Sequence, residues 1–135
     1  MGAWGNGSFD NDDAADFLTD VTDGEDLAPV REIFAVVVSS NDYLEAPDAS
    51  QAIAAAEIVA VILGRPTSAA QEEEELVAWL ARVKPVVDSD LSKQAAQVLD
   101  RILAPNSELS ELWEESDEFA DWKATVSDLR AHLQV

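Results

Sequence analysis

Apolar residues recur at steps of three and four along most of the chain, which is the pattern of helices that bury one face. The clearest case lies between Asp26 and Ser39, where the apolar positions are Leu27, Val30, Ile33, Phe34, Val37 and Val38. The sequence AVVV at 35–38 is β-like in composition, so a strand is the main alternative there. The flanking periodicity favours a helix. No alternation of apolar and polar residues is long enough to predict a sheet.

Capping and stop signals divide this pattern into six or seven helices. Gly24 and Gly64 are typical helix ends. The predicted caps are Asp10 or Asn11, a residue near Asp26, Asp48, Ser68, Asp88 or Asp90, Asn106 or Ser107, and Ser116. The sequence therefore predicts an all-α fold, a single irregular bundle of six or seven helices in one domain spanning residues 1–135.

One predicted helix differs from the others because it has almost no polar face. The run AIAAAEIVAVIL at 52–63 is apolar nearly all round, with Glu57 as its only charge. A helix of this kind is usually buried on most sides, so we expect it at the centre of the domain. Trp113 and Trp122 fall on apolar stripes and are expected in the core. Trp79 lies off the stripe of its helix and either packs on a neighbour or sits in an exposed groove.

The net charge of the chain restricts the classes of partner that it is expected to bind. There are 28 acidic and 8 basic residues, for a formal net charge of −20. A nucleic acid is not expected as a partner, because binding phosphates requires a basic surface, and an anionic membrane is excluded for the same reason. A basic protein partner, cations or simple solubility remain as explanations.

Other functional classes lack their sequence signals. The chain has no cysteine, which excludes a disulfide, a thiolate zinc site and a cysteine nucleophile. No 18-residue apolar stretch and no secretory signal pattern is present, so we expect a cytoplasmic protein. His132, the only histidine, is expected at the surface near the end of the last helix. No pair of carboxylates stands out for acid–base chemistry, so no catalytic residue and no cofactor are predicted.

The opening stretch MGAWGNGSFDNDDAADF carries the candidate binding residues. They are Trp4, Asn6, Asp10, Asn11, Asp12, Asp13 and Asp16. Four of them, Asp10, Asp12, Asp13 and Asp16, offer carboxylate oxygens to Ca²⁺ or Mg²⁺. The EF-hand pattern does not fit, because Ala15 occupies the position where that loop requires glycine.

The favoured interpretation of this stretch is structural. Gly5 and Gly7 permit a tight turn before a capped helix, and Trp4 and Phe9 are expected to anchor it to the domain. A cation site is the second interpretation and a contact to a partner or ligand the third. A phosphate loop is not expected, because no strand precedes the glycines and carboxylates crowd the first helical turn.

Two further acidic runs each have two interpretations, one structural and one functional. EEEE at 72–75 suits the first turns of a helix, where the helix dipole favours negative charge. The second run comprises Glu108, Glu111, Glu114, Glu115, Asp117 and Glu118. Each is either a solvated surface or a patch for a basic partner, and like charges at this density reduce stability.

Three stretches carry a resemblance to a known family. MGAWGNGSFDNDDAADF at the start, AAAEIVAVILGRP in the middle and RILAPNSELSELWEES toward the end resemble the bacterial family catalogued as domain of unknown function 4259. The resemblance covers essentially the whole chain, and the first stretch is the most distinctive. It implies a small, stand-alone, mainly helical bacterial domain and supplies no activity or catalytic residue.

These observations favour a non-enzymatic acidic helical protein that binds a basic macromolecular partner. The alternative is a divalent-cation-binding domain that uses the Asp10–Asp16 cluster. A third hypothesis is an enzyme with a carboxylate site that no motif reveals.

Overall fold

The computed structural model of the chain describes residues 7–40 and 42–133. That part of the chain contains eight helices and no strand, so the predicted all-α fold is confirmed. The helices are α1 (Asp12–Thr22), α2 (Ala28–Val38), α3 (Ala46–Ile62), α4 (Ser68–Gln71), α5 (Glu74–Val83), α6 (Ser89–Leu103), α7 (Glu108–Glu114) and α8 (Phe119–His132). None of these helices is long and apolar enough to cross a membrane.

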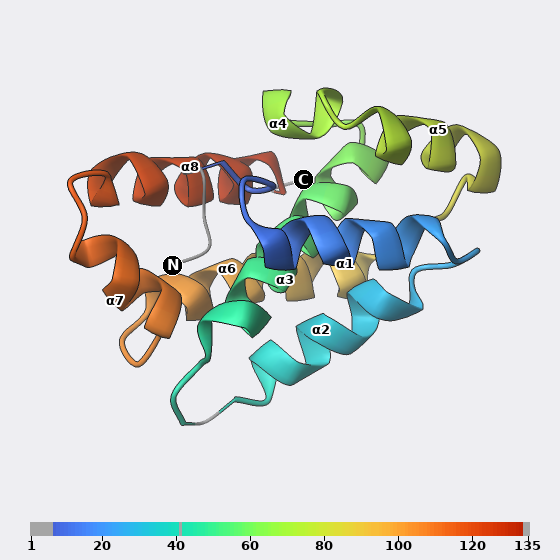
Figure 1. Cartoon of the computed structure of the whole chain (residues 1–135). Helices are drawn as coiled ribbons and strands as arrows, with labels where there is room; N and C mark the ends of the chain where they lie inside the picture. Colours follow the sequence, from blue (N-terminus) through green and yellow to red (C-terminus); the bar gives the residue numbers. More distant parts are fainter. Residues whose placement is uncertain (1–6, 41, 134–135) are drawn as a thin grey trace.

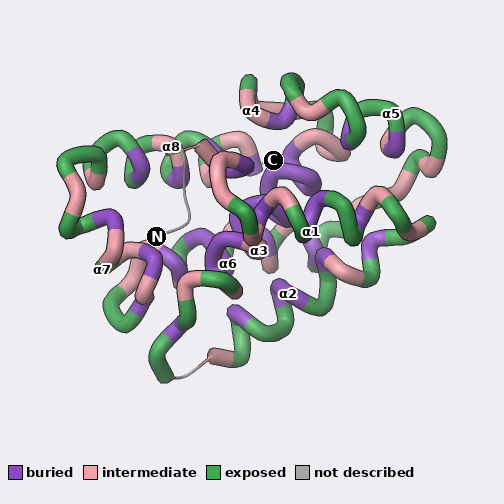
Figure 2. The backbone as a smooth tube through the Cα atoms, in the orientation of Figure 1, coloured by how far each residue is buried: buried purple, intermediate pink, exposed green. Residues whose placement is uncertain are grey.

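The helix α3 runs through the middle of the molecule, as the sequence predicts. It contacts α1, α2, α4, α6, α7 and α8, and Figure 1 shows α1 crossing in front of it, α2 below it and α6 behind. Burial is continuous along it from Ala52 to Ala60, which Figure 2 shows as an unbroken buried stretch. The alanines at 54–56 are fully buried. Their small side chains let the surrounding helices approach closely.

Several predicted caps are confirmed. The Asn11 side chain accepts a hydrogen bond from the Ala14 N–H at 2.8 Å, and Asp88 caps α6 through the Leu91 N–H at 2.8 Å. The helix α2 begins and ends close to its predicted bounds, so the β-like run at 35–38 is helical. The flanking apolar stripe, with Ile33 and Phe34 buried, outweighs the local preference of the valines.

Two predicted helix starts are wrong, and a partner distant in the sequence explains the first of them. The helix α3 begins at Ala46 and not after Asp48, since the Glu108 carboxylate accepts the Ala46 N–H at 2.7 Å. The helix predicted to begin after Ser68 begins after Thr67, whose side chain accepts from the Ala70 N–H. This predicted helix is also divided into α4 and α5, which raises the number of described helices to eight.

Trp79, Trp113 and Trp122 are buried in the core. Trp113 and Trp122 stack with ring centroids 6.2 Å apart and planes 10° from parallel, which joins α7 to α8. Trp79 is buried and its Nε1–H donates to the Gly24 carbonyl at 2.8 Å. Of the two sequence interpretations of Trp79, packing on a neighbour is therefore the one that holds.

Candidate functional site

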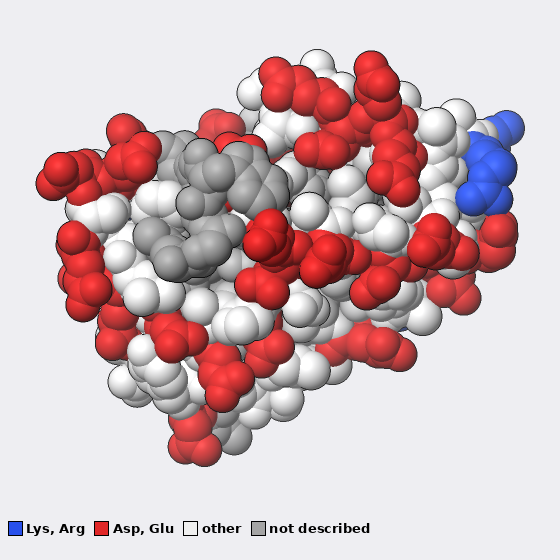
Figure 3. Space-filling view, in the orientation of Figure 1, with Lys and Arg blue, Asp and Glu red and all other residues white. Residues whose placement is uncertain are grey.

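Nearly all the negative charge of the protein faces solvent. Glu57 is the one buried acid, and Asp10, Asp13, Asp48, Glu73 and Glu108 are half-buried. Every other Asp and Glu is exposed. Figure 3 shows acidic atoms distributed across the whole visible face, whereas the visible Lys and Arg atoms gather at one edge, near the end of α5.

Several of the basic side chains bind acceptors within the molecule. Three arginines pair with carboxylates, in Arg31–Asp88 at 3.4 Å, Arg82–Glu25 at 3.1 Å and Arg130–Asp100 at 2.9 Å. Arg101 donates instead to four backbone carbonyls. With 28 acids against 8 bases, the outward field is dominated by carboxylates.

Carboxylates form a regular row on α1. Asp12, Asp16 and Asp20 are exposed and lie four residues apart, so successive Cα atoms rise about 6 Å along one side of the helix. Like charges at this spacing destabilise a helix by a few tenths of a kcal/mol per pair. The row therefore has a small cost in stability.

A second acidic segment lies beside α1. The Thr22 hydroxyl donates to Glu75 at 2.8 Å, which holds the end of α1 beside the start of α5. The pKa of Glu73 is raised, first by burial and then by the negative charges of Asp10, Glu75 and Glu72. We call the surface formed by Asp12, Asp16, Asp20 and Glu72–Glu75 the anionic face.

The predicted cluster at the N-terminus is placed partly in the turn before α1 and partly on the anionic face. Asp10 Oδ2 accepts the Gly7 N–H at 3.2 Å, while its own N–H donates to the Gly7 carbonyl at 3.1 Å. Phe9 is buried, so the predicted anchor of this turn is confirmed. Trp4 and Asn6, and with them the other predicted anchor, lie outside the described residues.

The cation interpretation gains no support from this geometry. Within residues 7–40 and 42–133, no three acidic or histidine side chains come together in a way that could hold a metal ion. Asn11 uses its side-chain oxygen for the helix cap, and Asp12 and Asp16 face solvent. A metal site at Asp10, Asp12, Asp13 and Asp16 stays a prediction.

Asn11 and Asp13 also line a small cavity. Its described lining includes Ser50 on α3 and the stacked rings of Trp113 and Trp122. The cavity measures about 40 Å³, whereas pockets that bind small molecules usually measure several hundred. Its size suits packing and water better than a ligand.

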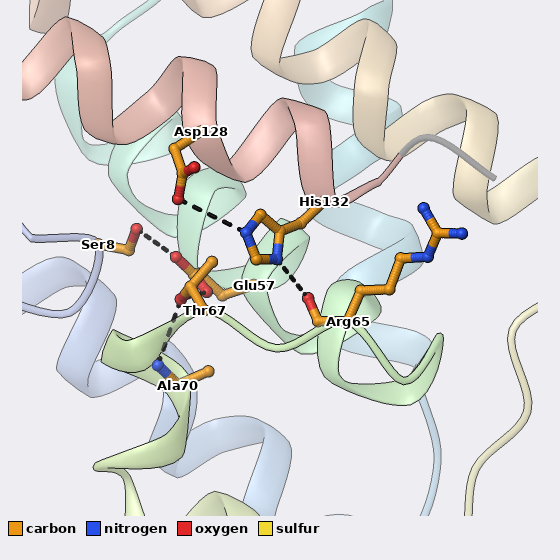
Figure 4. Close-up of polar contacts among 7 residues, drawn as sticks. All are labelled: Ser8, Glu57, Arg65, Thr67, Ala70, Asp128 and His132. Carbon is orange, nitrogen blue, oxygen red and sulfur yellow. Dashed lines mark hydrogen bonds and ion pairs between the residues drawn. The ribbon is translucent and has the colours of Figure 1, made fainter.

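The buried Glu57 is the centre of a polar cluster that joins distant segments, shown in Figure 4. The Ser8 hydroxyl donates to Glu57 Oε1 at 2.7 Å, and the Thr67 hydroxyl donates to Oε2 at 2.6 Å. The same Thr67 oxygen accepts from the Ala70 N–H. One carboxyl group thus connects the turn before α1, the middle of α3 and the start of α4.

The environment of Glu57 acts on its ionisation in opposite directions. Burial raises the pKa of Glu57, and this effect outweighs the hydrogen bonds from Thr67 and Ser8, which lower it. His132 lowers the pKa further and Asp128 raises it. The net pKa is raised, because a desolvated carboxylate is costly even with two donors.

His132 completes the cluster from α8. Its Nδ1 lies 2.8 Å from the Arg65 carbonyl, and its Nε2 lies 3.6 Å from Asp128. The half-buried ring therefore ties the end of α8 to the segment between α3 and α4. It is not arranged as the base of a catalytic triad, because the Ser8 hydroxyl is directed at Glu57.

The Glu57 cluster was not among the predicted sites. One signal for it is the single charge in an apolar helix, because a buried charge requires hydrogen-bond partners. The Asp128–His132 spacing of four residues is a second signal. Nothing in the sequence connects either feature to Ser8 or Thr67.

Comparison with known proteins gives a family and no function. The family model described as a domain of unknown function, DUF4259, matches residues 2–125. No curated protein and no solved structure matches the chain.

Proposed function

We propose that this chain, which belongs to the DUF4259 family of domains of unknown function, is a non-enzymatic cytoplasmic protein. In this proposal it acts by binding a basic macromolecular partner. The observation that carries this proposal is the anionic face. The carboxylates of its α1 row are regularly spaced and exposed, and the ion pairs of Arg31, Arg82 and Arg130 are made with acids outside this face.

Physical chemistry supports a partner of opposite charge. An excess of one charge over a whole surface steers a complementary protein and accelerates its association. The cost of repulsion within the α1 row is repaid when a basic surface neutralises it. A partner that presents Lys or Arg along a helix or groove could pair with acids whose Cα atoms are spaced about 6 Å apart along α1.

A non-enzymatic role is supported by the placement of the reactive groups. The Ser8 hydroxyl lies next to a carboxylate, which is an arrangement that could activate a nucleophile. Both side chains are buried, however, so a substrate would not reach them without a local opening. Their contacts suit a structural role.

The test is capture of a partner by the immobilised protein, with two variants of equal charge. The first variant removes the α1 row, by Asp12→Asn, Asp16→Asn and Asp20→Asn. The control removes three exposed acids elsewhere, by Glu114→Gln, Asp117→Asn and Asp121→Asn. Both variants change the net charge equally, so a difference between them reports the face and not the total charge.

We expect a discrete basic protein to be captured at about 0.05 M NaCl and lost at about 0.5 M, where screening is strong. The α1 variant should lose capture and the control variant should retain most of it. Failure to capture a basic protein, or equal loss in both variants, would contradict the proposal.

A further inference from the structure

The Glu57 carboxyl group lies where two surface segments meet the buried helix. Residues 7–11 approach it through Ser8, and residues 67–73 approach it through Thr67. Figure 4 shows these two side chains reaching the carboxyl group from separate segments. We call this three-way contact the seam. Because 49 residues separate Ser8 from Glu57, the seam closes a long loop of the chain.

The seam depends on whether Glu57 carries a proton. A protonated carboxyl has a carbonyl oxygen that accepts from one hydroxyl and an O–H that donates to the oxygen of the other, so both segments keep a hydrogen bond to the uncharged group. A carboxylate accepts from both hydroxyls but has lost most of its hydration, which is costly. Water can reach it only if one of the two segments moves away.

We propose that Glu57 is a pH-sensitive latch, which holds residues 7–11 and α4 against α3 when its carboxyl is protonated and loosens both segments when it ionises. The proton released on opening goes to solvent, and water takes the place of the two hydroxyls. Phe9 stays as an apolar anchor of residues 7–11, so we expect local opening and not loss of the fold.

Some of the charged groups around the seam favour ionisation of its carboxyl groups and others oppose it. From α8, His132 favours the carboxylate and Asp128 opposes it. Across the seam, Asp10 on residues 7–11 opposes the ionisation of Glu73 between α4 and α5. The pKa values of Glu57 and Glu73 are both raised, so ionisation of either adds negative charge to a crowded contact. Rising pH therefore weakens the seam.

The sign of the effect follows from linkage. Glu57 has a raised pKa in the closed seam and an ordinary one once hydrated, so closing takes up a proton when the pH lies between the two values. In that range the equilibrium constant for opening rises as much as tenfold for each pH unit. Below the ordinary pKa of glutamate the seam is at its tightest, and above the raised pKa the dependence ends.

The absence of cysteine from the sequence allows a local measurement by thiol labelling. Ala70→Cys places a reporter in α4, where the Ala70 N–H contacts Thr67, and Ala95→Cys places a control in the buried face of α6. Each labelling rate is divided by the rate of the same variant unfolded in urea at the same pH. This ratio removes the pH dependence of the thiol itself.

We expect the protection of Cys at position 70 to fall several-fold between about pH 5 and pH 8, while protection at position 95 changes much less. Adding Glu57→Gln should make the profile at position 70 flat. Adding Ser8→Ala instead removes a donor to the carboxylate, so the fall in protection should extend to higher pH.

The proposal is overturned if Glu57→Gln leaves the profile at position 70 unchanged. It is also overturned if both positions lose protection together, because global unfolding would then explain the pH dependence. If Glu57→Gln does not fold, the Ser8→Ala profile decides, and an unshifted profile overturns the latch.

Discussion

Arg101 joins two loops through its hydrogen bonds to backbone carbonyls. Its guanidinium, in the last turn of α6, donates to the carbonyls of Ser40, Asp42, Pro105 and Asn106, at distances from 2.7 to 3.5 Å. The same two loops are joined by the Leu44 N–H to the Asn106 carbonyl at 2.8 Å and by the Glu108 N–H to the Leu44 carbonyl at 2.9 Å. The planar fork of five donors suits this role, and a lysine cannot reproduce it.

Replacing Arg101 should therefore destabilise the fold. We expect Arg101→Lys to lower the free energy of unfolding by about 1–3 kcal/mol, since several carbonyls lose a charged donor. The measurement is urea unfolding followed by tryptophan fluorescence. Arg82→Lys is the control, because Arg82 and Glu25 form an exposed pair and the expected change there is below about 1 kcal/mol. Equal losses in the two variants would show that the loop contacts of Arg101 are not what stabilises this end of the molecule.

Glu57 shows which properties of a single residue can be predicted from the sequence. The sequence shows Glu57 as the only charge in an apolar run, and the structure buries it. Its partners could not be predicted, because Ser8 and Thr67 meet it only after α1, α3 and α4 have packed. The predicted binding residues Asp10 and Asn11 differ from Glu57, because their partners are local. Asp10 accepts a hydrogen bond within the turn before α1, and Asn11 caps that helix, which are roles that suit their side chains.

At the scale of elements, helices with a clear apolar stripe and a local cap were predictable. The helices α1, α2, α6 and α8 lie close to their predicted positions. The division between α4 and α5 was not predictable from capping signals. Ala70 and Leu76 are both buried, yet a continuous helix would direct them about 120° apart. Interrupting the helix at Glu72–Glu73 lets α4 face α3 and α5 face α1.

The choice of cap before α4 gives a test of this account. Thr67→Val should lower the free energy of unfolding by about 1–3 kcal/mol, because it removes both the cap and a donor to the buried Glu57. Ser68→Ala should change it by less than about 0.5 kcal/mol, because Ser68 is exposed and does not cap the helix. Chemical unfolding of both variants measures the difference. A larger effect at Ser68 would favour the cap that the local sequence predicts.

At the scale of the whole molecule, the sequence predicted a central position for the apolar helix, and the structure confirms it. All of the acids except Glu57 are exposed or half-buried. What composition could not predict is their arrangement, in which the α1 row and the EEEE run at 72–75 form one face. That face arises because α1 and α5 both pack at the same side of the core, and the contact between Thr22 and Glu75 fixes them there.

The surplus of negative charge should make the stability of the protein depend on salt. With 28 acids against 8 bases, repulsion acts on the compact state more strongly than on the unfolded chain, so about 0.5 M NaCl should raise the melting temperature by screening it.

Asp16→Asn removes both like-charge pairs of the α1 row, with Asp12 and with Asp20. We expect it to stabilise the protein by about 0.5 kcal/mol at low salt and by less at high salt. Asp42→Asn, an exposed acid in a loop, is the control and should gain less. Thermal unfolding measures all three proteins, and a melting temperature that falls with salt would mean that favourable ion pairs, such as Arg130–Asp100, outweigh the repulsion.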